Sequence, residues 1–92
     1  MDYDWLKRVA DISDDYTSII FLDSFNQKIE PDTLPEKLTN LIFGCWFNQK
    51  IEPNTLPENL TNLTFGGCFD QKIESDSLPK KLTTLTFGAL IV

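Results

Sequence analysis

Phe47 to Cys68 reads FNQKIEPNTLPENLTNLTFGGC, and nearly the same 22 residues stand on both sides of it. Phe25 to Trp46 reads FNQKIEPDTLPEKLTNLIFGCW, and Phe69 to Leu90 reads FDQKIESDSLPKKLTTLTFGAL. The period has no insertion, and Tyr16 to Ser24 matches the second half of a unit. Self-similarity at a period of this length indicates a solenoid, in which each unit packs on its neighbours in the chain.

A single unit is too small to fold alone. The middle unit offers apolar side chains at six positions that can point inward, namely Phe47, Ile51, Leu56, Leu60, Leu63 and Phe65. Their burial falls short of the entropy cost of ordering the whole unit, so contacts between stacked units must supply the rest. We therefore expect equivalent residues of successive units to lie directly over one another in columns.

The second half of each unit has the pattern of a short strand. Leu60 to Phe65 reads LTNLTF, whose latter part alternates between apolar and polar residues and contains residue types that favour strands. We predict a parallel sheet of about four short strands, which lie near residues 19–21, 40–43, 62–65 and 84–87. The predicted fold class is a mainly-β repeat solenoid.

Glycine and proline define the remainder of each unit. A glycine follows each predicted strand, at positions 44, 66 and 88, where either a positive φ or a close approach of two backbones requires it. Each unit also contains a Leu-Pro pair, at 34–35, 56–57 and 78–79. Because proline disfavours helix in the residue before it, we expect extended return segments.

The N-terminus is predicted to close one end of the stack. Trp5, Val9, Ile12 and Tyr16 have the spacing of an apolar stripe on a helix, and Asp2 or Asp4 could cap its start. We interpret residues 1–15 as a cap with a short helix that packs Trp5 and Val9 on the first coil; a partner-binding helix is the alternative. The solenoid then covers residues 16–92, with units 25–46, 47–68 and 69–90 and the half unit 16–24.

Composition limits the function classes. The net charge of −6 argues against binding to nucleic acid and to anionic membranes, which both require clustered lysine and arginine. The sequence has no apolar run long enough to span a bilayer and no apolar leader segment near Met1. We therefore expect a cytoplasmic protein.

The residues of most catalytic and metal sites are missing from the sequence. It has no histidine, no glycine-rich phosphate loop and no G-x-S-x-G motif, so we predict no enzyme activity, no catalytic residues, no cofactor and no metal. Cys45 and Cys68 lack the spacing of a zinc site. They are interpreted as two part-buried thiols, with a disulfide between stacked coils as the alternative.

The motif L-P-x-x-L-T-x-L-x-F-G-x-x-F-N-Q-x-I runs from Leu34 to Ile51 and again from Leu56 to Ile73, with Asp70 in place of the asparagine. It resembles the FNIP repeat, a family of social amoebae and large DNA viruses that is grouped with leucine-rich repeats. The resemblance implies a leucine-rich-repeat-like arc, a protein-interaction role without catalysis, and host cytoplasm as the location if the chain is viral. The leucine-rich-repeat pattern would place its asparagine at Trp46 and Cys68, two residues before Asn48 and Asp70. We therefore expect the asparagine ladder to be either absent or offset.

Two surfaces are candidates for binding. On the outer face of the predicted sheet, two columns face away from the core, and these are Asn40, Asn62 and Thr84 beside Ile42, Thr64 and Thr86. We expect this strip to contact an unidentified protein, as the fold analogy suggests. The alternative function is a structural or self-associating unit that forms a homo-oligomer through an uncapped C-terminal edge at Leu90, Ile91 and Val92.

Charged and amide side chains form three further columns in the first half of the unit. They are Gln27, Gln49 and Gln71; Lys28, Lys50 and Lys72; and Glu30, Glu52 and Glu74. We interpret the lysine and glutamate columns as a solvated, mutually paired face. The glutamine column could form amide ladders along the stack.

Overall fold

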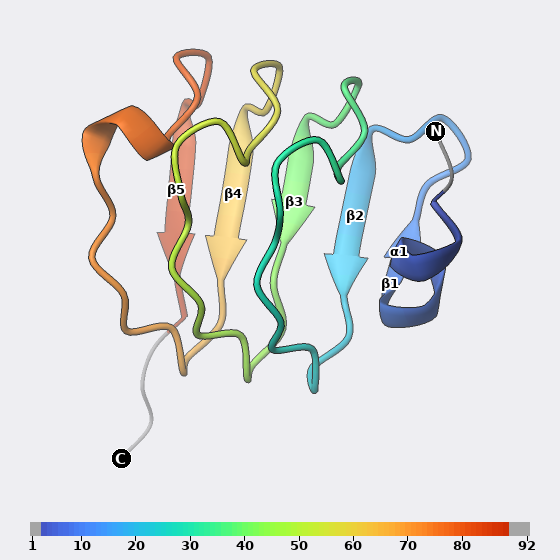
Figure 1. Cartoon of the computed structure of the whole chain (residues 1–92), viewed down its shortest axis with the longest axis horizontal. Coiled ribbons are helices and arrows are strands. Elements are labelled where there is room, and N and C mark those ends of the chain that lie inside the picture. The colour runs from blue at the N-terminus through green and yellow to red at the C-terminus, as the bar shows by residue number, and fades with distance from the viewer. Residues whose placement is uncertain (1–2, 89–92) are drawn as a thin grey trace.

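Five strands form one sheet in the order of the chain. The computed structural model describes residues 3–88, with a helix α1 (Asp4–Val9), a 3-10 helix η1 (Ser75–Ser77) and five strands (Figure 1). The strands are β1 (Ala10–Ile12), β2 (Ser18–Phe21), β3 (Asn40–Ile42), β4 (Asn62–Phe65) and β5 (Thr84–Phe87). Strands β2 to β5 are parallel, whereas β1 is antiparallel to β2. The predicted strands are confirmed, and β1 is an addition to them.

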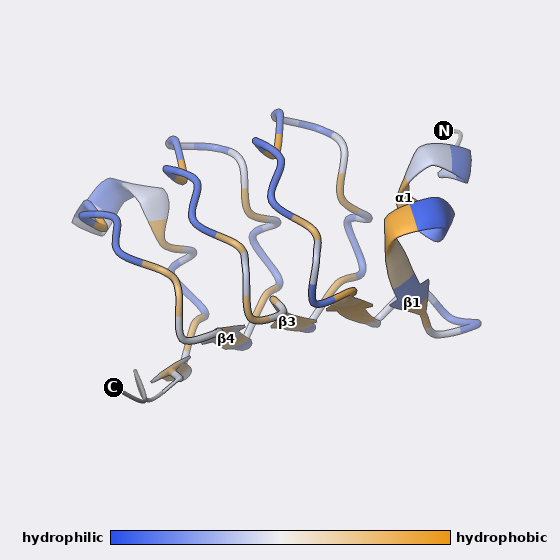
Figure 2. Ribbon diagram, turned by 90° about the horizontal axis from the view of Figure 1, so that it is seen from below, coloured by the Kyte–Doolittle hydropathy of each residue, from blue (hydrophilic) through white to orange (hydrophobic). Residues whose placement is uncertain are grey.

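The register of the sheet places equivalent residues opposite one another. Ile19 pairs with Leu41, Leu41 with Leu63, and Leu63 with Leu85. Each step is one repeat, so the expected columns are confirmed. The predicted fold class, a mainly-β solenoid with a parallel sheet and extended return segments, is confirmed with it. Figure 2 shows the return segments crossing one face of the sheet.

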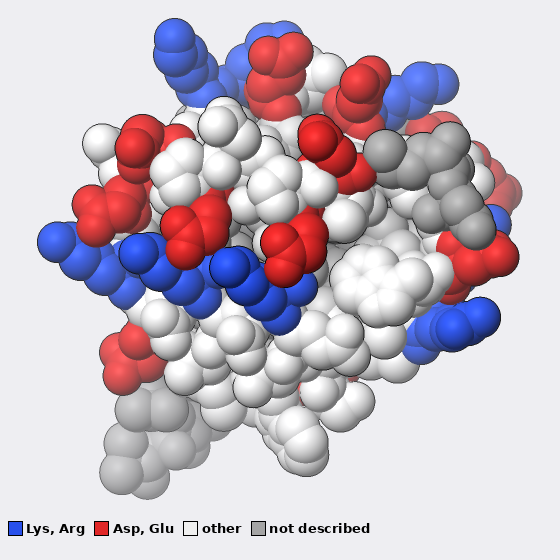
Figure 3. All heavy atoms as spheres, in the orientation of Figure 1, with Lys and Arg blue, Asp and Glu red and all other residues white. Residues whose placement is uncertain are grey.

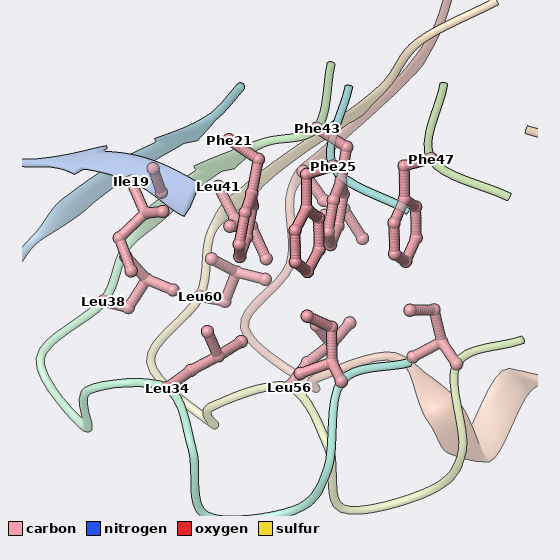
Figure 4. Packing of buried hydrophobic residues seen from close by; sticks show 14 of the residues in the cluster. Ile19, Phe21, Phe25, Leu34, Leu38, Leu41, Phe43, Phe47, Leu56 and Leu60 are labelled. Atoms are coloured by element: carbon pink, nitrogen blue, oxygen red, sulfur yellow. The ribbon is translucent and has the colours of Figure 1, made fainter. Parts of the chain in front are cut away.

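The core consists of apolar columns that run along the stack. All six inward side chains predicted for the middle unit are buried. Phenylalanine forms two parallel columns whose rings stack from coil to coil (Figure 4), namely Phe21, Phe43, Phe65 and Phe87, and Phe25, Phe47 and Phe69. The Phe21 and Phe43 ring centroids lie 5.1 Å apart, and those of Phe43 and Phe65 lie 5.4 Å apart. Stacked rings add specific geometry to the apolar burial.

A threonine column connects the coils where each strand begins. The Thr17 carbonyl accepts hydrogen bonds from the backbone N–H groups of Thr39 and Asn40, at 2.9 and 3.0 Å, and from the Thr39 hydroxyl at 3.2 Å. The carbonyls of Thr39 and Thr61 accept the same three donors from the next coil. Each of these threonine carbonyl oxygens therefore has its hydrogen-bonding capacity satisfied within the stack.

The glycines after the strands are explained by close backbone packing. Residues 3–88 contain no glycine with a positive φ. A Cβ built on Gly44 would lie 2.6 Å from the Asp23 Cα, and one on Gly66 would collide with the Gly44 carbonyl oxygen. The positive φ values in the repeats belong instead to Asp32 and Asn54, at 67° and 68°.

The turn on the return side changes with one substitution. Asp32 and Asn54 each follow a proline, and a positive φ after proline is the pattern of a type II turn. In the third unit Ser75 replaces this proline, and Ser75–Ser77 forms the 3-10 helix η1. Loss of the proline therefore alters the local turn without breaking the repeat.

The helix of the N-terminal cap is shorter than the predicted stripe. Helix α1 ends at Val9, while Ile12 lies in β1 and Tyr16 lies in a turn with a φ of 61°. The prediction of one stripe through Tyr16 is wrong, because residues 10–12 instead pair with the free edge of β2. Such a short helix has little stability of its own and depends on packing.

The side chain that closes the core is also different from the predicted ones. Leu6 is fully buried, whereas Trp5 and Val9 are half-buried. The N-cap position is Tyr3, without a side-chain capping bond; Asp4 is in the first turn and Asp2 lies outside the described residues. Figure 2 shows α1 lying over β1 at this end of the stack.

Within residues 3–88, no further coil covers the β5 end of the stack. Leu41 and Leu63 are fully buried, but their partner in β5, Leu85, is 37% exposed. Phe87, at the end of the phenylalanine column, is 54% exposed. The predicted edge residues Leu90, Ile91 and Val92 lie outside the described residues. Within residues 3–88, no helix has the length and apolar character needed to cross a bilayer.

Candidate interaction surface

The sheet brings the six predicted binding residues together on its outer face. Asn40 pairs with Asn62 and Asn62 with Thr84, while Ile42 pairs with Thr64 and Thr64 with Thr86. Of these six, Asn62, Thr84 and Thr86 are exposed and the others are half-buried. They form two adjacent columns across β3, β4 and β5, and we call these columns the outer strip.

The chemistry of the outer strip changes along the stack. At the β5 end it presents hydroxyl groups, from Thr64, Thr84 and Thr86. Toward the cap it presents the side-chain amide of Asn40, which donates to the Ser18 hydroxyl at 3.5 Å. Apolar groups follow beyond this amide. Ile20 is the register partner of Ile42 and is 46% exposed. A partner would therefore meet apolar surface near β2 and β3 and hydrogen-bonding groups near β5.

Sequence reasoning missed two exposed apolar side chains beside the predicted strip. Ile20 extends the Ile42 column by one coil, and the match of the half unit 16–24 to later units would have placed it there. Leu22, which is 47% exposed, stands where the later units have glycine, so the repeat pattern carried no signal for it. Trp46, at 60% exposure, occupies a position that differs in every unit.

The asparagine ladder is present and offset. The Asn26 side-chain oxygen accepts the backbone N–H of Asn48 at 2.9 Å, and the Asn48 oxygen accepts that of Asp70 at 2.9 Å. Each oxygen also accepts the amide of the following glutamine, Gln49 or Gln71, at 2.9 Å. The glutamines thus join the asparagine ladder, which differs from the amide ladder we expected for the glutamine column alone.

The return face carries the charge. Figure 3, which looks onto the return segments, shows a row of basic side chains with acidic ones beside it. Of the three expected Lys–Glu pairs, the structure of residues 3–88 brings one within ion-pair distance, Lys72 and Glu74 at 3.7 Å. Both side chains are well exposed, and such pairs contribute little to stability. This face is solvated, with less pairing than we predicted.

The described part of the chain offers no evident metal centre. No group of three or more potential histidine, cysteine, aspartate or glutamate ligands comes together within residues 3–88. A shallow groove between the first and second return turns is lined by Asp32, Glu36, Asn54 and Glu58. The Thr55 hydroxyl at this groove is buried without a hydrogen-bond partner.

The two cysteines lie on adjacent coils, in the turns that follow β3 and β4. Both are exposed free thiols, so the expectation of partial burial is wrong. The reason is that both lie beyond the strands, in turns outside the apolar columns. The Cys68 backbone N–H donates to the Cys45 carbonyl oxygen at 3.1 Å. A hydrogen bond with the Cys68 thiol, together with its charge, raises the pKa of Cys45.

Comparisons with known proteins agree with this geometry. The family model described as FNIP Repeat matches residues 10–45 and 47–89. A solved structure described as CroV588, a novel circular LRR protein, is similar at 38% identity with a TM-score of 0.55. That match covers 74% of this chain but only 13% of the other, so the chain corresponds to a small part of that protein's length. Among curated proteins, none matches.

Proposed function

The chain belongs to the FNIP repeat family, and from this premise we propose that it is a non-catalytic module that binds a protein partner through the outer strip. One observation carries the proposal. The strip consists of exposed or half-buried side chains whose spacing is set by the register of a continuous parallel sheet. A surface that is ordered before binding loses little conformational entropy when a partner docks.

The partner class follows from charge and surface chemistry. The net charge of −6 disfavours nucleic acid and anionic membranes, and the outer strip with the adjacent Ile20 combines apolar side chains with hydroxyls and amides. Protein interfaces have this mixture, with an apolar centre and hydrogen-bonding groups around it. We place the protein in the cytoplasm, as part of the same proposal.

The test compares two charge-neutral double variants. Asn62→Arg with Thr64→Glu puts two long charged side chains in the middle of the outer strip. Lys28→Glu with Glu30→Lys is the control, because it exchanges charges at exposed positions on the return face. Proteins captured by the wild type and by the control variant, but lost with the strip variant, support the proposal once direct binding is reproduced with purified components.

The same experiment can overturn the proposal. Circular dichroism and thermal melting must show that both variants are folded. If the folded strip variant binds the same purified partner with unchanged affinity, the outer strip is not the binding site.

A second function is favoured by the open end of the stack. We propose as the alternative that two copies associate through β5, where Leu85 and Phe87 are exposed. Since α1 and β1 occupy the other end, the two copies would meet tail to tail, with their β5 strands antiparallel about a two-fold axis. Leu90, Ile91 and Val92 would extend this interface. An exposed strand edge favours such pairing.

Sedimentation at increasing protein concentration tests this alternative. We expect a dimer for the wild type and a monomer for Phe87→Asp combined with Leu90→Glu. A wild type that remains monomeric at high concentration would refute tail-to-tail pairing. Because the edge variant leaves the outer strip intact, partner binding by this variant separates the two functions.

A further inference from the structure

We propose that Cys45 and Cys68 form a modification site, which a small disulfide oxidises reversibly to a disulfide that joins units 25–46 and 47–68. The two residues belong to successive units but stand one position apart in the repeat, with Cys45 directly after Gly44 and Cys68 after Gly66 and Gly67. The two cysteines are therefore diagonal neighbours on adjacent coils.

Backbone contacts fix the two cysteines side by side. The Cys68 N–H donates to the Cys45 carbonyl oxygen at 3.1 Å, as a residue does to the neighbouring strand of a parallel pair. A Cβ built on Gly66 would lie 2.8 Å from the Cys45 Cα, so the two turns pack tightly. Adjacent coils lie about 4.8 Å apart and one residue advances the chain by about 3.3 Å, so two Cα atoms that are one position out of register lie about 6 Å apart, within the 4.4–6.8 Å that disulfides require.

The side chains meet as well. The Cys68 thiol is the main cause that raises the pKa of Cys45, so the two side chains lie within range of each other. Both thiols are exposed, so a small oxidant can reach them without opening the core. Since the thiolate is the attacking species, we expect the reaction to accelerate as the pH rises above neutrality.

The reaction is a thiol–disulfide exchange with a small-molecule disulfide such as oxidised glutathione as oxidant. The thiolate of one cysteine attacks a sulfur of the oxidant, forms a mixed disulfide and releases one thiol. The second cysteine loses its proton and attacks its neighbour's sulfur, which displaces the other half of the oxidant. The protein loses two protons and two electrons, and the oxidant becomes two thiols.

The disulfide would join two neighbouring units inside the stack, 25–46 and 47–68. A bond between Cys45 and Cys68 closes a loop of one repeat and restricts the unfolded chain. Oxidation should therefore raise the melting temperature, by about 10 °C for a domain of this size.

The experiment equilibrates the full chain in glutathione redox buffers and measures its intact mass and its melting curve. The matched control carries Ser24→Cys with Cys45→Ser. This variant also has two exposed thiols, but they lie two coils apart, about 10 Å, which is too far for a disulfide. The single variants Cys45→Ser and Cys68→Ser retain one thiol each.

We expect the wild type to lose the mass of two hydrogen atoms and to melt at a higher temperature when oxidised. The control and the single variants should instead accumulate mixed disulfides with glutathione. If the wild type also accumulates mixed disulfides, or forms disulfide-linked dimers in place of the internal bond, the proposal is overturned. An internal disulfide that forms equally well in the Ser24→Cys control would overturn the geometric reasoning.

Discussion

Truncation of two equivalent leucines should have very different costs. Leu63 lies between Leu41 and Leu85 in the same column and is fully buried, whereas Leu85 is 37% exposed and has a neighbour on one side only. Leu63→Ala leaves a cavity with leucines above and below it, which should cost about 3–4 kcal/mol. Leu85→Ala removes less buried surface and opens to solvent, and it should cost about 1 kcal/mol.

Urea denaturation followed by circular dichroism measures both costs. With a slope of about 1 kcal/mol/M for a small domain, the two midpoints should differ by about 2 M. The comparison is internal, because the two substitutions delete the same atoms at equivalent positions of one repeat. A chain of this size has about 5–14 kcal/mol of stability in total, so the Leu63 variant should be clearly weakened.

Equal costs at the two positions would refute the columnar reasoning for a monomer. They would mean that Leu85 is covered as completely as Leu63. Repeating the titration at several protein concentrations then identifies the cover. If the cost of Leu85→Ala rises with concentration, a second copy covers the open end.

Four further substitutions test other contacts. Gly66→Ala should cost about 2 kcal/mol or more by urea denaturation, because its Cβ would collide with the Gly44 carbonyl; a neutral effect would contradict the close packing of the turns. Thr55→Val should be neutral or stabilising, since its hydroxyl is buried without a partner, whereas Thr33→Val should cost about 1 kcal/mol through loss of a hydrogen bond to a backbone carbonyl; the reverse order in urea titrations would contradict this. Hydrogen bonds, chiefly from the Thr17 hydroxyl, hold the pKa of Asp15 below its ordinary value of 3.8. The ionised Asp15 therefore stabilises the fold above that pH, and this stabilisation is lost as the pH falls. Melting curves of Asp15→Asn should therefore show lower stability at neutral pH and a smaller loss on acidification than the wild type.

The repeat made most of the solenoid predictable. Once the period was known, one unit predicted the others, and the pairing of Leu41 with Leu63 and Leu85 followed from counting residues. The inward side chains also followed, because burial of the same position in each unit is what stacking requires. The outer strip was located by the same alternation along the strands.

The sequence was less informative wherever a residue stands outside the repeat. The spacing of Trp5, Val9, Ile12 and Tyr16 is compatible with one long helix, but the free edge of β2 offers hydrogen bonds that a helix cannot satisfy. Residues 10–12 therefore pair as β1. Such competition between local pattern and an open sheet edge depends on contacts that are distant in sequence.

The positions of the asparagine and the cysteines needed coordinates for a different reason. The asparagines lie in irregular segments and the cysteines in turns, where the alternation of a strand no longer predicts which side chains meet. Cys68 contacts Cys45 although the two differ by one position in the repeat. The period predicts the stacking of strands well, but the stacking of turns also depends on glycines that allow the backbones to touch.

The threonine column has a consequence for how such a chain can change in length. Each carbonyl of the threonine column accepts three hydrogen bonds, all from the following coil. Every junction between two coils, here called a seam, therefore uses the same donors and acceptors. A gene duplication or deletion that spans one whole unit recreates an identical seam. An insertion of any other length would place the wrong residue against the carbonyl, so recombination should preserve the period even where the side chains diverge.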